Sequence, residues 1–284
     1  MIKHPGRLIG GLFALCVVGV AALIIVTNLR TATLERDVRS GKPDDVRSAL
    51  QQRPELARLK LLAQGSRSSS IGARTSNDLW RGRYIIHDVV SDGNVSVASV
   101  LAEFGADLSV RLDGQSLLHL ATQNRHLEMI RWLVGKGANV NDRIDCKDCE
   151  QAGQTPLHIA GGASEVLLSL GADVRAADAA GRTALHVTQS TEKETMLCAY
   201  GADVHQRDRS GSTAFDLAKR IPADKQDKPG QLADWIRPGG GCERLAARVR
   251  RGIAPNWDEV WAAYRQYVCE RGQSPELRDC PKKP

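Results

Sequence analysis

Short polar turns and pairs of short apolar helical segments alternate along much of this chain. The clearest example runs from Gly153-Gln154-Thr155-Pro156-Leu157-His158 to Gly171-Ala172-Asp173-Val174. Weaker copies of the same pattern begin at Tyr84, Ser116, Thr183 and Thr213. A repeat of this kind predicts a stack of similar helical units, in which each unit buries its apolar face against its neighbours.

The uneven spacing of the copies predicts where the stack departs from regularity. His119 and His158 are 39 residues apart, whereas His158 and His186 are only 28 apart, against a usual period of about 33. The long step predicts an inserted finger over residues 141–152. This short step and the step of 30 residues from His186 to Asp216 predict clipped helices in the third and fourth copies. Because Gly161-Gly162 interrupts the first helix of the third copy, we expect a local irregularity and a notch there.

Composition divides the rest of the chain into flanking segments. Residues 31–62 carry apolar side chains four residues apart on two short helices, and we expect a helical cap there. Residues 63–82 are rich in Ser, Gly and Arg and are expected to form a flexible connection. The repeats occupy residues 83–222, and a Pro- and Gly-rich linker follows over 223–241. Residues 242–284 are expected to form a helical hairpin and tail whose apolar stripe seals the last repeat.

An uncharged run of 19 residues, 9–27, lies near the N-terminus. As a helix it is about long enough to cross a hydrocarbon core of ~30 Å. A basic flank over residues 1–8 precedes it, and we expect an uncleaved transmembrane anchor with the N-terminus inside. A cleaved signal peptide is the alternative, although its apolar region usually has only ~7–15 residues. The basic residues after the run argue against export of the bulk, whereas the cysteine content argues for it.

Six cysteines lie outside this run, at Cys146, Cys149, Cys198, Cys242, Cys269 and Cys280. An even number permits disulfides in an exported domain. Cys146 and Cys149 favour a local disulfide, with free thiols or a metal or redox site as the alternatives. Cys242 and Cys269 lie at opposite ends of the expected C-terminal hairpin, which predicts a disulfide between them, with the last cysteine as a competing partner. Cys198 stands in an apolar segment and is expected to be a buried small side chain.

Thr155-Pro156-Leu157-His158, followed by Gly171-Ala172-Asp173, resembles the ankyrin repeat, and the resemblance covers about half of the chain. It implies an all-α ankyrin-repeat solenoid of about four to five repeats with helical caps, preceded here by one transmembrane helix. In that family the Thr and His hydrogen-bond within the turn, the Leu points into the stack, and the Gly supplies a positive φ. The resemblance also implies that a protein partner binds the concave face and the fingers.

No pattern in the sequence indicates catalysis. There is no nucleophile elbow, no phosphate-binding glycine loop and no His-Glu-x-x-His metal pair. The histidines of the repeats match the family's turn position, which implies a structural role. We therefore expect no enzyme activity, no cofactor and no metal. The formal charge of +6 is modest for 284 residues, and no dense Lys/Arg run predicts nucleic-acid binding.

Charged side chains on the fingers are the expected partner contacts: Arg111, Asp113, Arg143, Asp145, Lys147, Asp148, Arg175, Asp178, Arg207 and Arg209. Small anchored ankyrin proteins of this kind resemble bacterial periplasmic proteins that neutralise or support a partner. The expected location is therefore the inner membrane, with a single span and the bulk of the chain in the periplasm. The partner would be a toxin that the chain neutralises as an immunity protein. The alternative is a resident enzyme, such as a catalase, that the chain supports as an accessory factor.

Overall fold

The computed structural model describes residues 33–58, 83–147, 149–188, 191–219, 236 and 239–250. The chain divides into two compact units, residues 1–108 and residues 109–284. In both units the regular elements are mostly short helices arranged in pairs, as the repeat pattern predicted.

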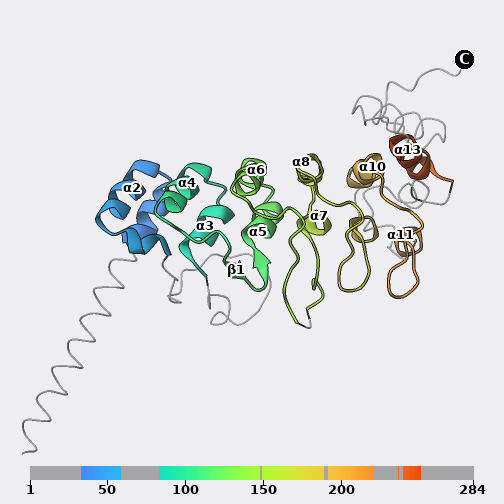
Figure 1. The fold of residues 1–284 in the computed structure, drawn as a ribbon, viewed down its shortest axis with the longest axis horizontal. Helices are drawn as coiled ribbons and strands as arrows, with labels where there is room; N and C mark the ends of the chain where they lie inside the picture. The colour runs from blue at the N-terminus through green and yellow to red at the C-terminus, as the bar shows by residue number, and fades with distance from the viewer. Residues whose placement is uncertain are drawn as a thin grey trace, which may run out of the picture. The chain divides into compact units, whose positions relative to one another are not determined.

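The first unit contains residues 33–40, α2 (Pro43–Gln52), the 3-10 helix η1 (Pro54–Arg58), α3 (Ile85–Ser91) and α4 (Val95–Glu103) (Figure 1). Residues 33–40 and α2 form one pair, and α3 and α4 form another. The two pairs are in contact because α2 packs on α4 and η1 packs on both α2 and α3. Arg58 reinforces this packing by donating from Nε to Gly105 O at 2.7 Å.

The two helix pairs of the first unit have the same layout. Gly41 and Gly93 each stand between the helices of their pair, and both have a φ of 72°. Glycine adopts this left-handed conformation without strain, so the chain reverses at the same point in each pair. Asn94 accepts from Val97 N at 3.0 Å and donates to Gly41 O at 3.1 Å. The segment expected as a cap over residues 31–62 therefore contains a helix pair with the layout of a repeat.

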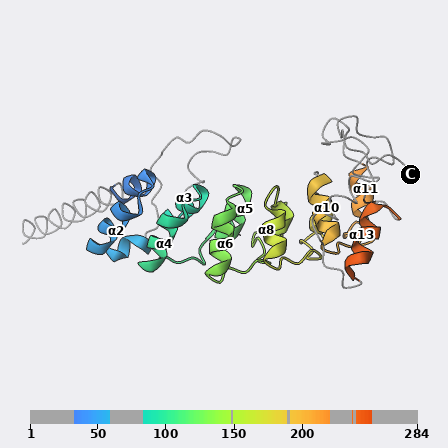
Figure 2. The same ribbon diagram turned by 90° about the horizontal axis from the view of Figure 1, so that it is seen from above.

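The second unit contains β1 (Arg111–Leu112), β2 (Gln115–Ser116), α5 (Leu117–Gln123), α6 (Leu127–Gly135), α7 (Pro156–Ile159), α8 (Ser164–Ser169), α9 (Ala184–Val187), α10 (Thr191–Ala199), α11 (Ala214–Ala218) and α13 (Gly241–Arg250). The first helices α5, α7, α9 and α11 pack in series, and the second helices α6, α8 and α10 form another series beside them (Figures 1 and 2). The strands β1 and β2 form a small antiparallel hairpin that the repeat pattern had not predicted.

Reciprocal hydrogen bonds start the first helices of the second unit. Thr155 N donates to His158 Nδ1 at 3.2 Å, and Thr155 Oγ1 lies 2.9 Å from the same nitrogen. The fourth copy repeats this arrangement. In the last copy Asp216 replaces the histidine, and its carboxylate accepts from Thr213 N at 3.0 Å. Each helix therefore begins at a capping box that its own local sequence supplies.

The helices of the third and fourth copies are clipped, as the spacing predicted. α3 and α5 have 7 residues each, whereas α7 and α9 have 4. The second helix of the third copy, α8, has 6 residues, but α10 keeps 9, so the fourth copy loses length only in its first helix. α7 ends just before Gly161, where an added Cβ would lie 3.3 Å from Arg125 Nε. The glycine thus lets the Arg125 guanidinium lie close to the backbone.

Aliphatic side chains form the core between the helices. Leu157, the leucine of the best-formed tetrapeptide, is 1% exposed, as the resemblance implied. Burial of one such side chain contributes roughly 1.5–3 kcal/mol. The neighbouring α5–α6 pair buries five large side chains to the same degree, namely Leu117, Leu118, Met129, Ile130 and Leu133.

Two disulfides join described residues. Cys146 pairs with Cys149, the local pair that the sequence favoured. Cys242 of α13 pairs with Cys198 of α10, so the predicted Cys242–Cys269 disulfide is wrong. Cys198 is buried, as expected, but it is bonded rather than a lone apolar side chain. The physical reason is that α13 packs directly on α10 and brings the two fully buried cysteines to one interface.

Several predictions fall outside the described residues. They concern the flank 1–8, the run 9–27, the connection 63–82, most of the linker 223–241, and the part of the C-terminal segment beyond residue 250, including Cys269. Among the residues that the structure does describe, no helix is both long and apolar enough to cross a membrane.

Candidate functional site

Four loops of the second unit project from the same side of the helix series and carry the charged residues predicted to bind a partner (Figure 1). We call them finger 1 (residues 109–116), finger 2 (139–154), finger 3 (173–183) and finger 4 (203–213). Finger 1 precedes α5, and the other three each join the second helix of one copy to the first helix of the next.

Finger 2 contains the insertion predicted over residues 141–152. Its base is closed by hydrogen bonds from Ile144 N to Gln154 O and from Gly153 N to Ile144 O, both at 2.9 Å. Ile144 is 3% exposed, so the base is fixed to the apolar core. The Cys146–Cys149 disulfide lies beyond this base and cross-links the tip. The insertion is therefore an extension of the finger with a hydrogen-bonded base and a covalently closed tip.

Backbone hydrogen bonds join neighbouring fingers. Each bond runs from an N–H of one finger to a carbonyl of the preceding finger. The three bonds are Asp145 N to Gly114 O at 3.0 Å, Ala179 N to Ala152 O at 2.9 Å and Arg209 N to Ala180 O at 2.9 Å. Because the fingers are already ordered against one another, a partner that binds them loses less entropy in fixing their conformation.

Arginine side chains brace fingers 1, 2 and 3. Arg111 donates from Nη1 to Gly114 O at 3.0 Å and to Arg143 O at 3.1 Å. Its Nη2 contacts both carboxylate oxygens of Asp142, at 2.7 and 2.9 Å. Arg143 occupies the same position in finger 2 and donates to a carbonyl of its own finger at 3.3 Å and to Ala177 O of finger 3 at 2.5 Å. Each arginine therefore ties its own finger to the next one.

The brace is absent between fingers 3 and 4. Ala177 stands in finger 3 where finger 1 has Arg111 and finger 2 has Arg143. Its methyl group cannot reach the next finger. Among the described residues, fingers 3 and 4 are joined by the backbone hydrogen bond from Arg209 N to Ala180 O. Of the three joints, this one is the least braced within the described residues.

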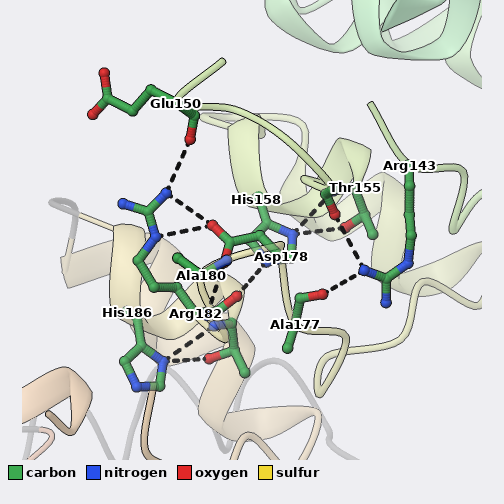
Figure 3. Close-up of polar contacts among 11 residues, drawn as sticks. Arg143, Glu150, Thr155, His158, Ala177, Asp178, Ala180, Arg182 and His186 are labelled. Atoms are coloured by element: carbon green, nitrogen blue, oxygen red, sulfur yellow. Dashed lines mark hydrogen bonds and ion pairs between the residues drawn. The ribbon is translucent and has the colours of Figure 1, made fainter. Parts of the chain in front are cut away.

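Asp178 holds finger 3 together (Figure 3). Its carboxylate accepts from the backbone N–H groups of Ala180 and Arg182 at 2.9 Å each, and from Arg182 Nε at 2.9 Å. Arg182 also donates to Glu150 O of finger 2 at 3.3 Å, and its carbonyl lies 2.8 Å from His158 Nε2. The side chain of Asp178 is only 1% exposed. The prediction that Asp178 contacts a partner is therefore wrong, because finger 3 buries and uses the carboxylate.

Four buried histidines follow the starts of the first helices in the first four copies. Burial lowers the pKa of His87 and of His158 from 6.5 to about 4, and it lowers the pKa values of His119 and His186 in the same direction. His119 Nε2 lies 3.1 Å from Gln154 O, so this neutral ring links one repeat to the next. Within the described ranges, no three His, Cys, Asp or Glu side chains converge as a metal site. His119 and His158 are thus hydrogen-bonded within the stack of repeats.

A cavity of about 390 Å³ opens beside the fingers, at the end of the clipped helix α9. The notch was expected one repeat earlier, at Gly161-Gly162. The wall of the cavity combines amide, guanidinium and aliphatic groups, a combination suited to holding a side chain of a partner. The lining residues are Glu150, Gln151, Gln154, Arg182, His186, Val187, Thr188 and Leu217.

The remaining predicted contacts divide into two groups. Arg111, Arg143 and Arg207 donate to backbone carbonyls of the fingers, so the scaffold uses part of each guanidinium. The second group is exposed, and its side chains make no hydrogen bond or ion pair with other described residues. It consists of Asp113, Asp145, Lys147, Arg175 and Arg209. Asp148 lies outside the described residues.

A buried charged pair in α10 escaped the sequence analysis. Lys193 Nζ donates to His158 O at 2.9 Å. Glu194 is fully buried, and neither carboxylate oxygen has a hydrogen-bond partner within the described residues. Burial lowers the pKa of Lys193 to about 7 and raises that of Glu194 well above its usual range. Neither side chain lines the cavity beside the fingers.

Comparison with protein families identifies the repeat. Residues 48–144 match the model of the family "Ankyrin repeats (3 copies)". The match begins inside α2. It therefore includes part of the helix pair that shares the layout of a repeat.

The chain is also similar to several curated ankyrin proteins. It is 42% identical over 60 residues to the NF-kappa-B inhibitor cactus of Drosophila yakuba, which covers 21% of this chain and 11% of that protein. It is 29% identical over 163 residues to the Ankyrin repeat and SOCS box protein 6 of Mus musculus, covering 55% and 37%. The Homo sapiens Notch-regulated ankyrin repeat-containing protein is 36% identical over 56 residues, covering 19% and 49%. The matched stretches span half or less of the length of these relatives.

Proposed function

Because this chain is an ankyrin-repeat protein, we propose that it is a non-catalytic module that binds a protein partner through its fingers. The observation that carries this proposal is that some residues of the fingers fix their conformation, whereas other charged residues are exposed and make no such contacts. Backbone bonds, Arg111 and Asp178 fix the fingers in place. Exposed charges such as Lys147 and Arg175 have no structural task among the described residues. A rigid row of uncommitted charges, with a cavity beside it, suits recognition of another protein.

A substitution experiment on the exposed finger residues tests this function. The wild-type chain is first used to capture its protein partner by affinity from the exported fraction. A variant carrying Lys147→Ala, Arg175→Ala and Arg209→Ala should keep the melting temperature but bind that partner at least about tenfold more weakly. The matched control is Arg131→Ala, which removes an exposed arginine from α6, away from the fingers. Equal binding by the triple variant and the wild type would reject the fingers as the contact surface.

The proposed setting is the bacterial inner membrane, with residues 9–27 as a single-pass anchor and the repeats in the periplasm. The uncharged N-terminal run supports the anchor. The two disulfides support an oxidising compartment, where such bonds persist. Protease added to spheroplasts should digest the repeats while a cytoplasmic marker survives. Digestion that begins only after lysis would contradict this orientation.

Two roles are proposed for the complex. In the first, the chain is an immunity protein that neutralises a toxin by covering it. In the second, it is an accessory factor that supports a resident periplasmic enzyme such as a catalase. Affinity capture from the exported fraction, followed by an activity assay of the captured protein, separates them. A toxin that loses activity on binding supports the first role, and a resident enzyme that gains activity supports the second.

A further inference from the structure

Finger 4 carries an arginine at the position that braces the earlier fingers. Arg111 and Arg143 each make two kinds of contact, one with a carbonyl of their own finger and one with a carbonyl of the next finger. Arg207 makes the first kind, because it donates from Nη1 to Gly211 O at 2.6 Å. It has no acceptor from a following finger among the described residues. Figure 1 shows finger 4, in orange, as the outermost loop of the row.

The backbone of finger 4 also has a carbonyl without the N–H donor that the earlier fingers receive from their neighbours. In fingers 1, 2 and 3, a backbone carbonyl accepts an N–H from the finger that follows, and these carbonyls belong to Gly114, Ala152 and Ala180. Ser210 stands directly before Gly211, as Ala152 and Ala180 stand directly before Gly153 and Gly181, and its carbonyl accepts no backbone N–H from the described residues. We call residues 207–211 the outer edge of finger 4. This edge offers a guanidinium and a carbonyl that match those filled in the earlier fingers.

The chain itself shows what fills such an edge. Against finger 1, finger 2 presents the carboxylate of Asp142 and the carbonyl of Arg143 to the Arg111 guanidinium. It also presents the N–H of Asp145 to the carbonyl of Gly114. The complementary segment therefore offers three groups in order. They are an acidic side chain, the backbone carbonyl of the next residue, and a backbone N–H three residues after the acid. A guanidinium that contacts both oxygens of a carboxylate makes a strong and directional pair.

The charges at the outer edge also favour an acidic segment. Arg207 and Arg209 are exposed. The carboxylate of Asp208 already accepts from Ser210 N at 2.8 Å and from Ser210 Oγ at 2.6 Å. Asp216 adds a negative charge near Arg207, but its carboxylate is bonded to the start of α11. The side chain of Arg209, and the part of the Arg207 guanidinium that does not bond Gly211 O, are thus left without a hydrogen-bond partner among the described residues, and they attract an acid more than a base.

We infer that the outer edge of finger 4 binds an extended acidic segment of the protein partner, with an aspartate or glutamate of that segment paired to Arg207. The segment adds to the row of fingers by backbone hydrogen bonds, as a strand adds to the edge of a sheet. This inference rests on the proposed binding function and names the chemistry of the partner segment.

A peptide that copies finger 2 is the probe. A fluorescein-labelled peptide with the sequence of residues 140–145 is titrated with the full-length chain in detergent, and its anisotropy is measured. Binding is expected, and replacement of the peptide's first aspartate by asparagine should weaken it about tenfold. Arg207→Ala in the protein should weaken peptide binding to a similar extent. Arg207→Lys should bind the peptide almost as weakly as Arg207→Ala, because lysine lacks the planar guanidinium that contacts both oxygens of a carboxylate. Arg131→Ala, which removes an exposed arginine from α6 and not from a finger, should leave the dissociation constant unchanged.

Three results would overturn the inference. The first is a peptide that does not bind. The second is peptide binding that stays equally tight in Arg207→Ala when the circular dichroism of that variant is unchanged. The third is peptide binding that becomes tighter when Asp224 and Asp227 of the protein are changed to Asn. The last result would mean that the chain covers its own edge. If the peptide fails but the finger variants still lose the captured partner, the binding function stands and only the acidic-segment inference is rejected.

Discussion

At the scale of single residues, the buried histidines make stability depend on pH. The pKa of His158 is about 4 in the folded chain because the ring is buried, against 6.5 when exposed. The unfolded state therefore binds more protons between these values, and stability falls as the pH is lowered from 6.5 towards 4. Between pH 6.5 and 5 the loss from this group is about 1–2 kcal/mol.

His158→Gln tests this dependence, because glutamine can still hydrogen-bond the start of α7 but does not titrate. Urea unfolding at pH 6.5 and at pH 5, followed by circular dichroism, gives the free energy of unfolding of each form. The difference between the two pH values should be smaller in the variant by about 1–2 kcal/mol. Identical pH dependence in the two proteins would show that His158 does not titrate as its burial requires.

Residues with a local role were predictable, and residues defined by distant packing were not. Thr155 and His158 interact three positions apart, so the tetrapeptide is sufficient to predict their hydrogen bonds. Asp178 resembles any charged residue of a polar loop, yet its partners lie two and four residues further on in a turn that buries it. Glu194 stands in a polar run at the start of α10, and its burial depends on neighbours that the run does not specify.

At the scale of elements, the joint between fingers 3 and 4 is a place where stability can be added. Ala177 pairs with Thr183 as Arg207 pairs with Thr213, so an arginine at residue 177 would start from the backbone position that Arg207 has. Ala177→Arg should restore the brace to the next finger and stabilise the chain by about 1 kcal/mol. The melting temperature should rise by about 2–4 °C.

The control for this prediction is Ala180→Arg, which adds the same charge to an exposed position of the same finger. Differential scanning calorimetry of both variants separates the brace from the charge. The brace is rejected if Ala177→Arg melts no higher than Ala180→Arg.

The spacing between the copies predicted how long each element is better than it predicted which elements lie next to one another. The short distances from His158 to His186 and from His186 to Asp216 require less helix, and α7 and α9 have 4 residues each. The long distance from His119 to His158 requires extra loop, and finger 2 contains it. The cavity was expected at Gly161-Gly162 but lies at the end of α9, because its wall is assembled from two fingers and two helices far apart in sequence.

At the scale of the whole molecule, a covalent link joins the C-terminal helix to the repeats. α13 packs on α10, and the Cys198–Cys242 disulfide spans 44 residues of sequence. The sequence had placed the bond within a C-terminal hairpin, because it shows which cysteines could meet in a local motif but not which helix α13 covers. Cys198 lies in an apolar segment, and an apolar setting is typical of both a buried thiol and a buried disulfide.

Removal of this disulfide should lower stability more than removal of the fingertip disulfide. Replacement of Cys198 and Cys242 by Ala should cost about 2–4 kcal/mol, because the bond closes the longer loop. Replacement of Cys146 and Cys149 by Ala is the matched control, and it opens a loop of sequence separation 3. Urea unfolding of the two double variants measures the difference. Non-reducing peptide mapping of the wild type should recover Cys198 and Cys242 in one linked fragment. A fragment that links Cys242 to Cys269 instead would mean that the C-terminal helix is closed on itself and not fastened to the repeats.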